Sequence, residues 1–318
     1  MNNTTMPWYV RWVIGTGAWV TAVVLIALGA AFVFALLDIQ NRAALAVFGA
    51  VLYGYGLWLL WHGASGIFAQ QLGIATAAAG AAMIAGGLAA ELQSLWAGFA
   101  VAILVGAGIV AATQDRILQF LAAALAAGFF VTALIESRMP YAIDFVALAT
   151  PLGLALLLYP PRRDFMPTAA VLMLTFPVSS LFAMENGFSM RTAAQGGTFA
   201  RVLHIALFVG LVFLHLRRSN AARTNLRALV FAAIAVIVCL LLPAGGSAAM
   251  LILMLSFVIG SKPYALLGSA LQAQFIARYY YSLEMNLLDK SLLLMAVGVV
   301  LTGAWWLLQR GKFGEAAA

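Results

Sequence analysis

The chain has 318 residues, of which 65% are hydrophobic and 8% are charged, and its formal net charge is +7. A soluble domain has about 25% charged residues, so this composition excludes a water-soluble fold. The basic residues are spread over short breaks between apolar runs, which argues against a nucleic-acid partner, and the single cysteine, Cys239, excludes a disulfide within the chain and a multi-thiolate metal site.

Apolar runs long enough to cross a bilayer as helices recur along the whole chain. In lipid every backbone polar group must be paired internally, and these runs do not alternate as barrel strands do. The sequence therefore predicts an all-α polytopic bundle of about twelve transmembrane helices, a single membrane domain over 1–318 with no separate soluble domain. The expected spans are 12–37, 43–61, 64–89, 94–112, 116–135, 141–159, 165–184, 199–216, 228–243, 246–260, 263–283 and 290–309.

The first span, 12–37, follows Arg11 and is too long for a cleaved signal peptide, so we expect an uncleaved signal-anchor helix. Small residues such as Gly73 and Gly80 lie in the third span and let helix backbones approach closely. Residues 243–246, Pro-Ala-Gly-Gly, indicate either a hairpin or a kink between two spans.

Two prolines, Pro151 and Pro177, lie within adjacent predicted spans. Each lacks a backbone N–H and frees the carbonyl one turn earlier, at Ala147 and Met173. Interrupted helices of this kind line the binding sites of transporters, but proline is also frequent in membrane helices generally. Both interpretations stay open at this point.

The charged residues sort unequally between alternate loops. Eleven of the 17 Lys and Arg fall on the side of the N-terminus, five fall on the other side, and Arg278 lies within a span. Cytoplasmic loops are enriched in Lys and Arg, so we expect both termini in the cytoplasm. Seven of the 10 acidic residues sort to the outer side, which indicates either solvated loop ends or an outward-facing site.

Arg278 is the clearest ionisable residue within a predicted span, and such residues are costly in lipid and often functional. Gln274, Arg278 and Tyr281 share one helix face, within snorkelling reach of the outer surface. We predict a polar outer-leaflet site that binds a polar or anionic group. Its candidate substrate-binding residues are Arg278, Tyr281, Glu284, Asp144 and Glu136. The alternative is an aromatic belt with a structural ion pair.

No catalytic residue, cofactor or metal site is expected. His204 and His215 are eleven residues apart, so they project from one helix face about 16 Å from each other and cannot ligate one metal. Phosphate-loop, zinc-protease and nucleophile-elbow motifs do not occur in the sequence. Ser179 and Ser180 beside Pro177 are better explained as partners of freed backbone groups than as nucleophiles. An enzyme is therefore the less favoured class.

The most distinctive segment lies at 279–298. It reads Tyr-Tyr-Tyr-Ser-Leu-Glu over 279–284 and Asn-Leu-Leu-Asp-Lys-Ser over 286–291, followed by Gly298 in an apolar run. This segment resembles the C-terminal signature of a bacterial family catalogued as domain of unknown function 4401. The resemblance implies a multi-pass protein of the bacterial inner membrane, with a related polytopic protein and a small membrane-tethered protein as candidate partners. From its residues alone, Asp289 is expected to cap the last helix.

Two functions of different classes follow from these features. The first is membrane transport, or the handling of a lipid or small molecule, through the polar outer site around Arg278. The second is a non-catalytic scaffold subunit that assembles with neighbouring membrane proteins or with copies of itself in the lipid bilayer, which the small-residue packing faces favour.

Overall fold

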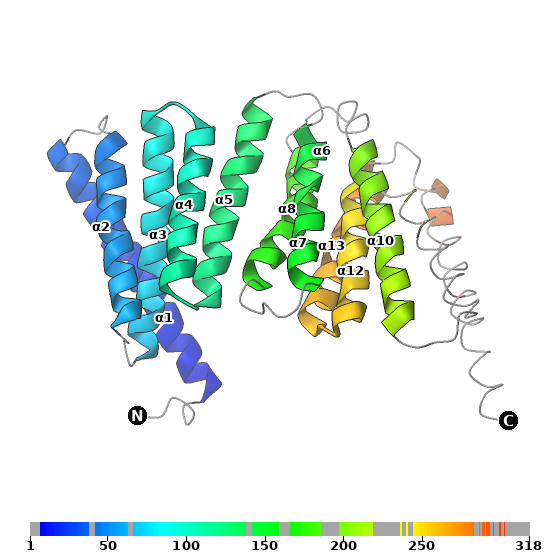
Figure 1. Cartoon of the computed structure of the whole chain (residues 1–318), viewed down its shortest axis with the longest axis horizontal. Helices are drawn as coiled ribbons and strands as arrows, with labels where there is room; N and C mark the ends of the chain where they lie inside the picture. The colour runs from blue at the N-terminus through cyan, green and yellow to red at the C-terminus, as the bar shows by residue number, and fades with distance from the viewer. Residues whose placement is uncertain are drawn as a thin grey trace. The chain divides into compact units, whose positions relative to one another are not determined.

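The structure, a computed structural model of the chain, describes residues 7–37, 42–62, 66–137, 142–158, 166–185, 197–218 and 244–282, and single residues or pairs elsewhere. Its contacts divide the chain into two compact units, unit 1 (1–175) and unit 2 (176–318). Figure 1 labels the helices of each unit. The prediction that the whole chain forms one membrane domain stays a prediction.

All regular elements in the described ranges are helices, which confirms the all-α prediction. They are α1 (Trp8–Leu37), α2 (Arg42–Trp61), α3 (Ile67–Glu91), α4 (Leu95–Ala112), α5 (Arg116–Glu136), α6 (Ala142–Ala147), α7 (Ala149–Leu158), α8 (Met166–Glu185), α10 (Thr198–Arg218), α12 (Ala244–Ile259) and α13 (Lys262–Ser282). The predicted span 228–243 lies almost wholly outside the described residues, as does 290–309.

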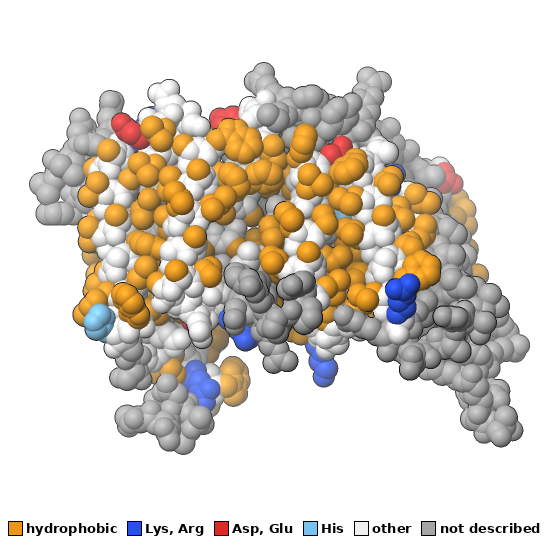
Figure 2. Space-filling view, viewed as in Figure 1, with side chains coloured by type: hydrophobic (Ala, Val, Ile, Leu, Met, Phe, Trp, Pro, Cys, Tyr) orange, Lys and Arg blue, Asp and Glu red, His pale blue; other side chains and the backbone are white. Residues whose placement is uncertain are grey.

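Six helices in the described part of the chain contain segments long and apolar enough to cross a membrane. They are Trp8–Gly29, Arg42–Trp61, Ile67–Glu91, Leu95–Ala112, Arg116–Glu136 and Thr198–His215. Hydrophobic side chains cover the visible lengths of the helices in both units, and charged side chains lie near helix ends (Figure 2). These apolar surfaces identify the chain as a membrane protein.

In unit 1, α2 and α3 pack antiparallel through small residues. Gly56 lies against the backbone of Ala77, and Gly80 lies against the backbone of Tyr53 and Gly49. A methyl group built on Gly56 would approach the Ala77 nitrogen to 2.5 Å, so these positions have no room for a side chain. The tight packing predicted from Gly73 and Gly80 is therefore present, and α2 is the helix that uses it.

A buried core joins α3, α4 and α5 around Ile74, Ile109 and Leu118. Tyr53 of α2 packs against this core, and its hydroxyl donates a hydrogen bond to the Val105 carbonyl of α4 at 3.0 Å. The hydroxyl comes so close to Gly108 that a methyl group there would lie 2.9 Å from it. Gly108 on α4 thus leaves space for the Tyr53 hydroxyl, which needs a hydrogen-bond partner inside the bundle.

Helix α5 begins with a strong cap. The Asp115 carboxylate accepts hydrogen bonds from the backbone N–H groups of Ile117 at 2.9 Å and Leu118 at 3.0 Å. It also accepts a bond from the Gln70 side chain of α3 at 3.4 Å, which ties the starts of two helices together.

Replacing Asp115 by alanine is expected to lower the free energy of unfolding by about 1 kcal/mol, because two backbone donors lose their partner. Asp115→Asn should cost much less, since an asparagine oxygen caps a helix about as well. Unfolding in mixed micelles followed by circular dichroism measures both variants. An asparagine variant as unstable as the alanine variant would show that the charge of Asp115, rather than its capping bonds, matters.

The predicted span 141–159 is interrupted rather than continuous. Helix α6 ends at Ala147 and α7 begins at Ala149, with a turn at Leu148 between them. The Leu148 N–H bonds to the Phe145 carbonyl at 3.1 Å, a tighter three-residue turn. The break falls where the missing N–H of Pro151 frees the Ala147 carbonyl, as the sequence predicted. By contrast, α8 runs through Pro177 as one helix.

In unit 2, α12 and α13 form a helical hairpin joined at Gly260 and Ser261. Gly260 has φ +67°, and the Ser261 N–H bonds to the Ser256 carbonyl at 3.0 Å, the arrangement of a glycine-terminated helix. Residues 244–246 form the start of α12, two residues before the predicted span 246–260, and the predicted hairpin or kink at Pro243 lies outside the described residues. Glycines occur both in turns and at closely packed helix starts, so the sequence pattern alone does not distinguish these two structures.

The expected cap at Asp289 is wrong. The Asn286 side-chain oxygen accepts a hydrogen bond from the Asp289 backbone N–H at 2.9 Å, and residues 288 and 289 are already helical. A capping side chain bonds to the N–H three residues ahead, so Asn286 is the capping residue. Asp289 instead stands in the first turn, where a carboxylate is favoured by the helix dipole.

Candidate functional site

Arg278, the centre of the predicted site, lies near the C-terminal end of α13 and is partly buried. Its guanidinium donates a hydrogen bond to the Leu181 carbonyl of α8 at 3.1 Å. Leu181 is four residues from the end of α8, where the helix dipole presents partial negative charge and favours a cation. Arg278 therefore contacts a neighbouring helix, α8.

Tyr281 extends the same face of α13 outward. Its side chain is 80% exposed, and its ring packs edge-on against Tyr280 with centroids 5.5 Å apart. Gln274, one turn before Arg278, is exposed as well. The predicted polar and aromatic face is thus present on α13, and Tyr281 has the exposure expected of a side chain at a membrane interface.

The other predicted site residues belong elsewhere in the chain. Glu136 ends α5 and is exposed, whereas Asp144 lies in the first turn of α6 and is buried, both within unit 1. Glu284 lies outside the described residues. The structure brings Arg278 and Tyr281 together on one helix, and the convergence of all five residues stays a prediction.

Sequence reasoning missed a polar pair next to Arg278's helix. His204 of α10 is fully buried, and its Nδ1 lies 3.4 Å from the Ser247 hydroxyl of α12. Its ring packs against Phe176 of α8 with centroids 4.7 Å apart. Two sequence features pointed to this pair: a histidine within an apolar run, and the Gly-Gly-Ser segment at 245–247. Neither feature indicates that His204 and Ser247 contact each other.

The hydrogen bonds of Ser247 favour one tautomer of His204. The single hydroxyl proton of Ser247 is donated to the Ala244 carbonyl at 2.6 Å. Ser247 can therefore only accept from His204, which places a proton on Nδ1. In a catalytic Ser-His pair the histidine would instead accept the proton of the serine. This pair is arranged for structure rather than for nucleophilic attack.

Close packing surrounds this pair. A methyl group built on Gly245 would overlap the Phe275 ring of α13 and approach the Ser180 Cβ of α8 to 3.0 Å. The Ser180 hydroxyl bonds to the Phe176 carbonyl at 2.9 Å, one turn earlier on the same helix, and not to the Met173 carbonyl that Pro177 frees. Helices α8, α12 and α13 thus meet closely near Gly245, and Arg278 lies about one turn beyond Phe275 on α13.

The comparisons with known proteins give one match. A family model described as Domain of unknown function (DUF4401) matches residues 7–311, nearly the whole chain. No curated protein and no solved structure matches it. The resemblance seen at 279–298 therefore extends over the full bundle, and the chain belongs to the family described as Domain of unknown function (DUF4401).

Proposed function

We propose that the chain is a membrane transport or lipid- and small-molecule-handling protein that binds a polar or anionic group at the Arg278 face of α13. The observation that carries this proposal is the partly buried guanidinium beside the exposed Tyr281, at the end of a helix. A cation at such a position is costly in lipid, and a guanidinium suits an anionic acceptor because it can donate five hydrogen bonds.

The topology that we propose has twelve spans with both termini in the cytoplasm of a bacterium, in its inner membrane. The excess of Lys and Arg on the side of the N-terminus supports it. In this arrangement the Arg278 end of α13 faces the outer leaflet. Labelling of introduced cysteines in intact cells tests it, because position 217 should be inaccessible and position 281 accessible to an impermeant reagent.

The interrupted helix of unit 1 supports transport in particular. Asp144 is only 9% exposed, and it precedes the break at Leu148 by about one turn of helix. Buried acids and interrupted helices are both common at the ion and substrate sites of transporters. We propose that Asp144 contributes to the coupling or substrate pathway of unit 1.

A ligand screen on the purified full chain tests the Arg278 proposal. Amphiphiles with phosphate, sulfate, carboxylate or neutral headgroups are added in detergent, and the midpoint of thermal unfolding is measured. We expect an anionic amphiphile to raise the midpoint of the wild type by several degrees, since a ligand bound at about 100 times its dissociation constant stabilises by about 2.7 kcal/mol. Arg278→Gln should lose most of this shift.

The matched control is Lys262→Gln, which removes a positive charge from the opposite end of α13. It should retain the wild-type shift. Equal loss in both variants would mean general charge attraction, and no anion-dependent shift in the wild type would remove the case for a site at Arg278.

A scaffold function is the second candidate, and the exposed face of α1 favours it. Gly17 has no atom within 4 Å of the position of a side chain, and the Thr21 hydroxyl is bonded back to the Gly17 carbonyl at 2.8 Å. A small, internally satisfied face of this kind lets another helix approach closely. Purification in a gentle detergent distinguishes the two functions. A stoichiometric partner that is lost in the Gly17→Leu variant supports the scaffold function. A monomer that the substitution leaves unchanged supports the first proposal.

A further inference from the structure

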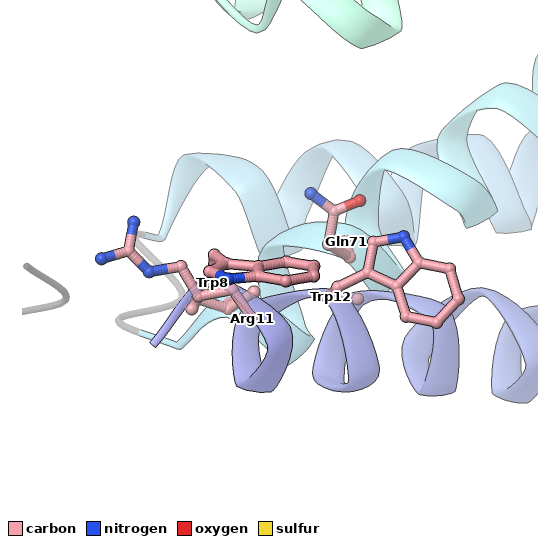
Figure 3. A pocket seen from close by; sticks show the side chains of 6 residues that line it. Trp8, Arg11, Trp12 and Gln71 are labelled. Carbon is pink, nitrogen blue, oxygen red and sulfur yellow. The ribbon is translucent and has the colours of Figure 1, made fainter. Parts of the chain in front are cut away.

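A pocket of about 450 Å³ lies between the first turns of α1 and α3 in unit 1. Its lining consists of Trp8, Arg11, Trp12, Gly15, Ile67 and Gln71 (Figure 3). The volume falls in the range of small-molecule sites, about 300–1,000 Å³. The lining combines one cation, one amide and two indole rings, which is a set of groups suited to an anion attached to an apolar body.

The pocket lies at the end of the bundle, where a headgroup region would be. Both α1 and α3 begin there, and α4 ends near the capping residue Asp115, which contacts Gln70 of α3. Trp8 is 79% exposed and Trp12 is 67% exposed. Exposed tryptophans at helix ends are typical of the membrane interface, because the indole ring is apolar and its N–H is polar.

A hydrogen bond inside unit 1 orients the amide of Gln71. The Trp19 indole N–H donates to the Gln71 side-chain oxygen at 3.0 Å. The amide nitrogen consequently points to the other side, toward the Arg11 end of the pocket (Figure 3). Gln71 and Arg11 both line the pocket, and an amide nitrogen and a guanidinium only donate hydrogen bonds, so each suits an anionic acceptor.

Asp115, whose carboxylate contacts the start of α3, should repel a bound anion only weakly. Asp115 does not line the pocket, and its carboxylate already accepts from Ile117, Leu118 and Gln70. A carboxylate with three donors at a helix N-terminus has much of its charge compensated locally. Among the described residues that line the pocket, Arg11 carries a charge, and this positive charge favours an anion.

We propose that this pocket binds the phosphate headgroup of an anionic phospholipid, with Arg11 and Gln71 as donors and Trp8 and Trp12 against the glycerol and upper acyl region. The apolar rings and the position at the bundle end favour a lipid over free phosphate as the source of the anion. This site is in unit 1 and is independent of the Arg278 proposal in unit 2.

Native mass spectrometry of the full chain in detergent, titrated with dioleoyl phosphatidylglycerol or dioleoyl phosphatidylcholine, tests the proposal. We expect the wild type to bind phosphatidylglycerol more tightly than phosphatidylcholine. Arg11→Gln should raise the dissociation constant for phosphatidylglycerol about fivefold or more, the effect of one basic residue at an anionic surface, and leave that for phosphatidylcholine unchanged.

Arg116→Gln is the matched control, because Arg116 is an exposed arginine at the same end of unit 1 but does not line the pocket. It should change the dissociation constant by less than about twofold. Gln71→Glu, an isosteric change that adds negative charge beside Arg11, should weaken phosphatidylglycerol binding selectively, and it serves if Arg11→Gln does not fold. Equal effects of Arg11→Gln and Arg116→Gln, equal affinity for both lipids, or full competition by inorganic phosphate would each overturn the proposal.

Discussion

Gly80→Ala is expected to lower the free energy of unfolding by about 2–3 kcal/mol, a large effect for a single methyl group. The added Cβ would overlap the Tyr53 backbone nitrogen and lie 2.6 Å from the Gly49 carbonyl oxygen. Backbone atoms of a helix cannot rotate away as a side chain can, so α2 and α3 must separate. Separation removes dispersion contacts along the whole interface, which is the main source of helix association in lipid.

The same substitution at Gly86 provides the control, because Gly86 is on α3 too and has no atom within 4 Å of a built side chain. Gly86→Ala should be neutral or stabilise by about 0.5–1 kcal/mol, since alanine is the better helix former. Unfolding of both variants in sodium dodecyl sulfate, followed by circular dichroism, gives the comparison. If the two variants were equally stable, close backbone contact would not be what joins α2 to α3.

His204→Ala is expected to cost about 3 kcal/mol of unfolding free energy, in the range found for removing a buried ring. The side chain is fully buried, so its loss leaves a cavity beside Phe176 and removes one of the two hydrogen-bond partners of Ser247. His215→Ala removes an exposed histidine from the same helix and should stay within about 0.5 kcal/mol of the wild type.

A double-mutant cycle separates the hydrogen bond from the cavity. Ser247→Ala removes one hydrogen-bond partner of His204 and should cost about 1–2 kcal/mol by itself. In the His204→Ala background the same change should cost clearly less, because the donor is already gone. Additive costs would mean that the two side chains stabilise unit 2 independently and would contradict the inferred bond between them.

Gly80 and His204 stabilise the fold in different ways. Gly80 has no side chain, and this lets the backbones of α2 and α3 come into contact. His204 places a polar ring at a fully buried position. Both lie at helix junctions, and neither is part of the proposed Arg278 or Arg11 sites. Variants at the junctions should therefore change stability, and variants at Arg278 or Arg11 should change ligand binding.

For the Arg278 site, the sequence predicted only the residues that share one helix. The spacing of Arg278 and Tyr281 placed them on one face of α13, and the structure confirms this. The hydrogen bond from Arg278 to Leu181 joins residues that are 97 positions apart. No local pattern in the sequence indicates which carbonyl a guanidinium will reach, because that depends on how neighbouring helices are rotated and shifted.

The sequence by itself determined the class of protein and most helix positions. The predicted spans 94–112 and 116–135 differ by one residue at most from each bound of α4 and α5, and the sequence indicated the position near Ala147 where Pro151 frees a carbonyl. Helix length in a membrane is set by bilayer thickness and internal backbone pairing, which are local properties of an apolar run. A proline's missing N–H is equally local.

The tertiary structure alone decided which faces meet. It paired Gly80 with α2, His204 with Ser247, and the Asn286 side chain with the last helix, where the sequence suggested Asp289. It also kept α8 continuous through Pro177 while α6 and α7 separate before Pro151. In an almost uniformly apolar chain the hydrophobic pattern carries little information on orientation, so close packing and the pairing of rare polar groups choose the partners.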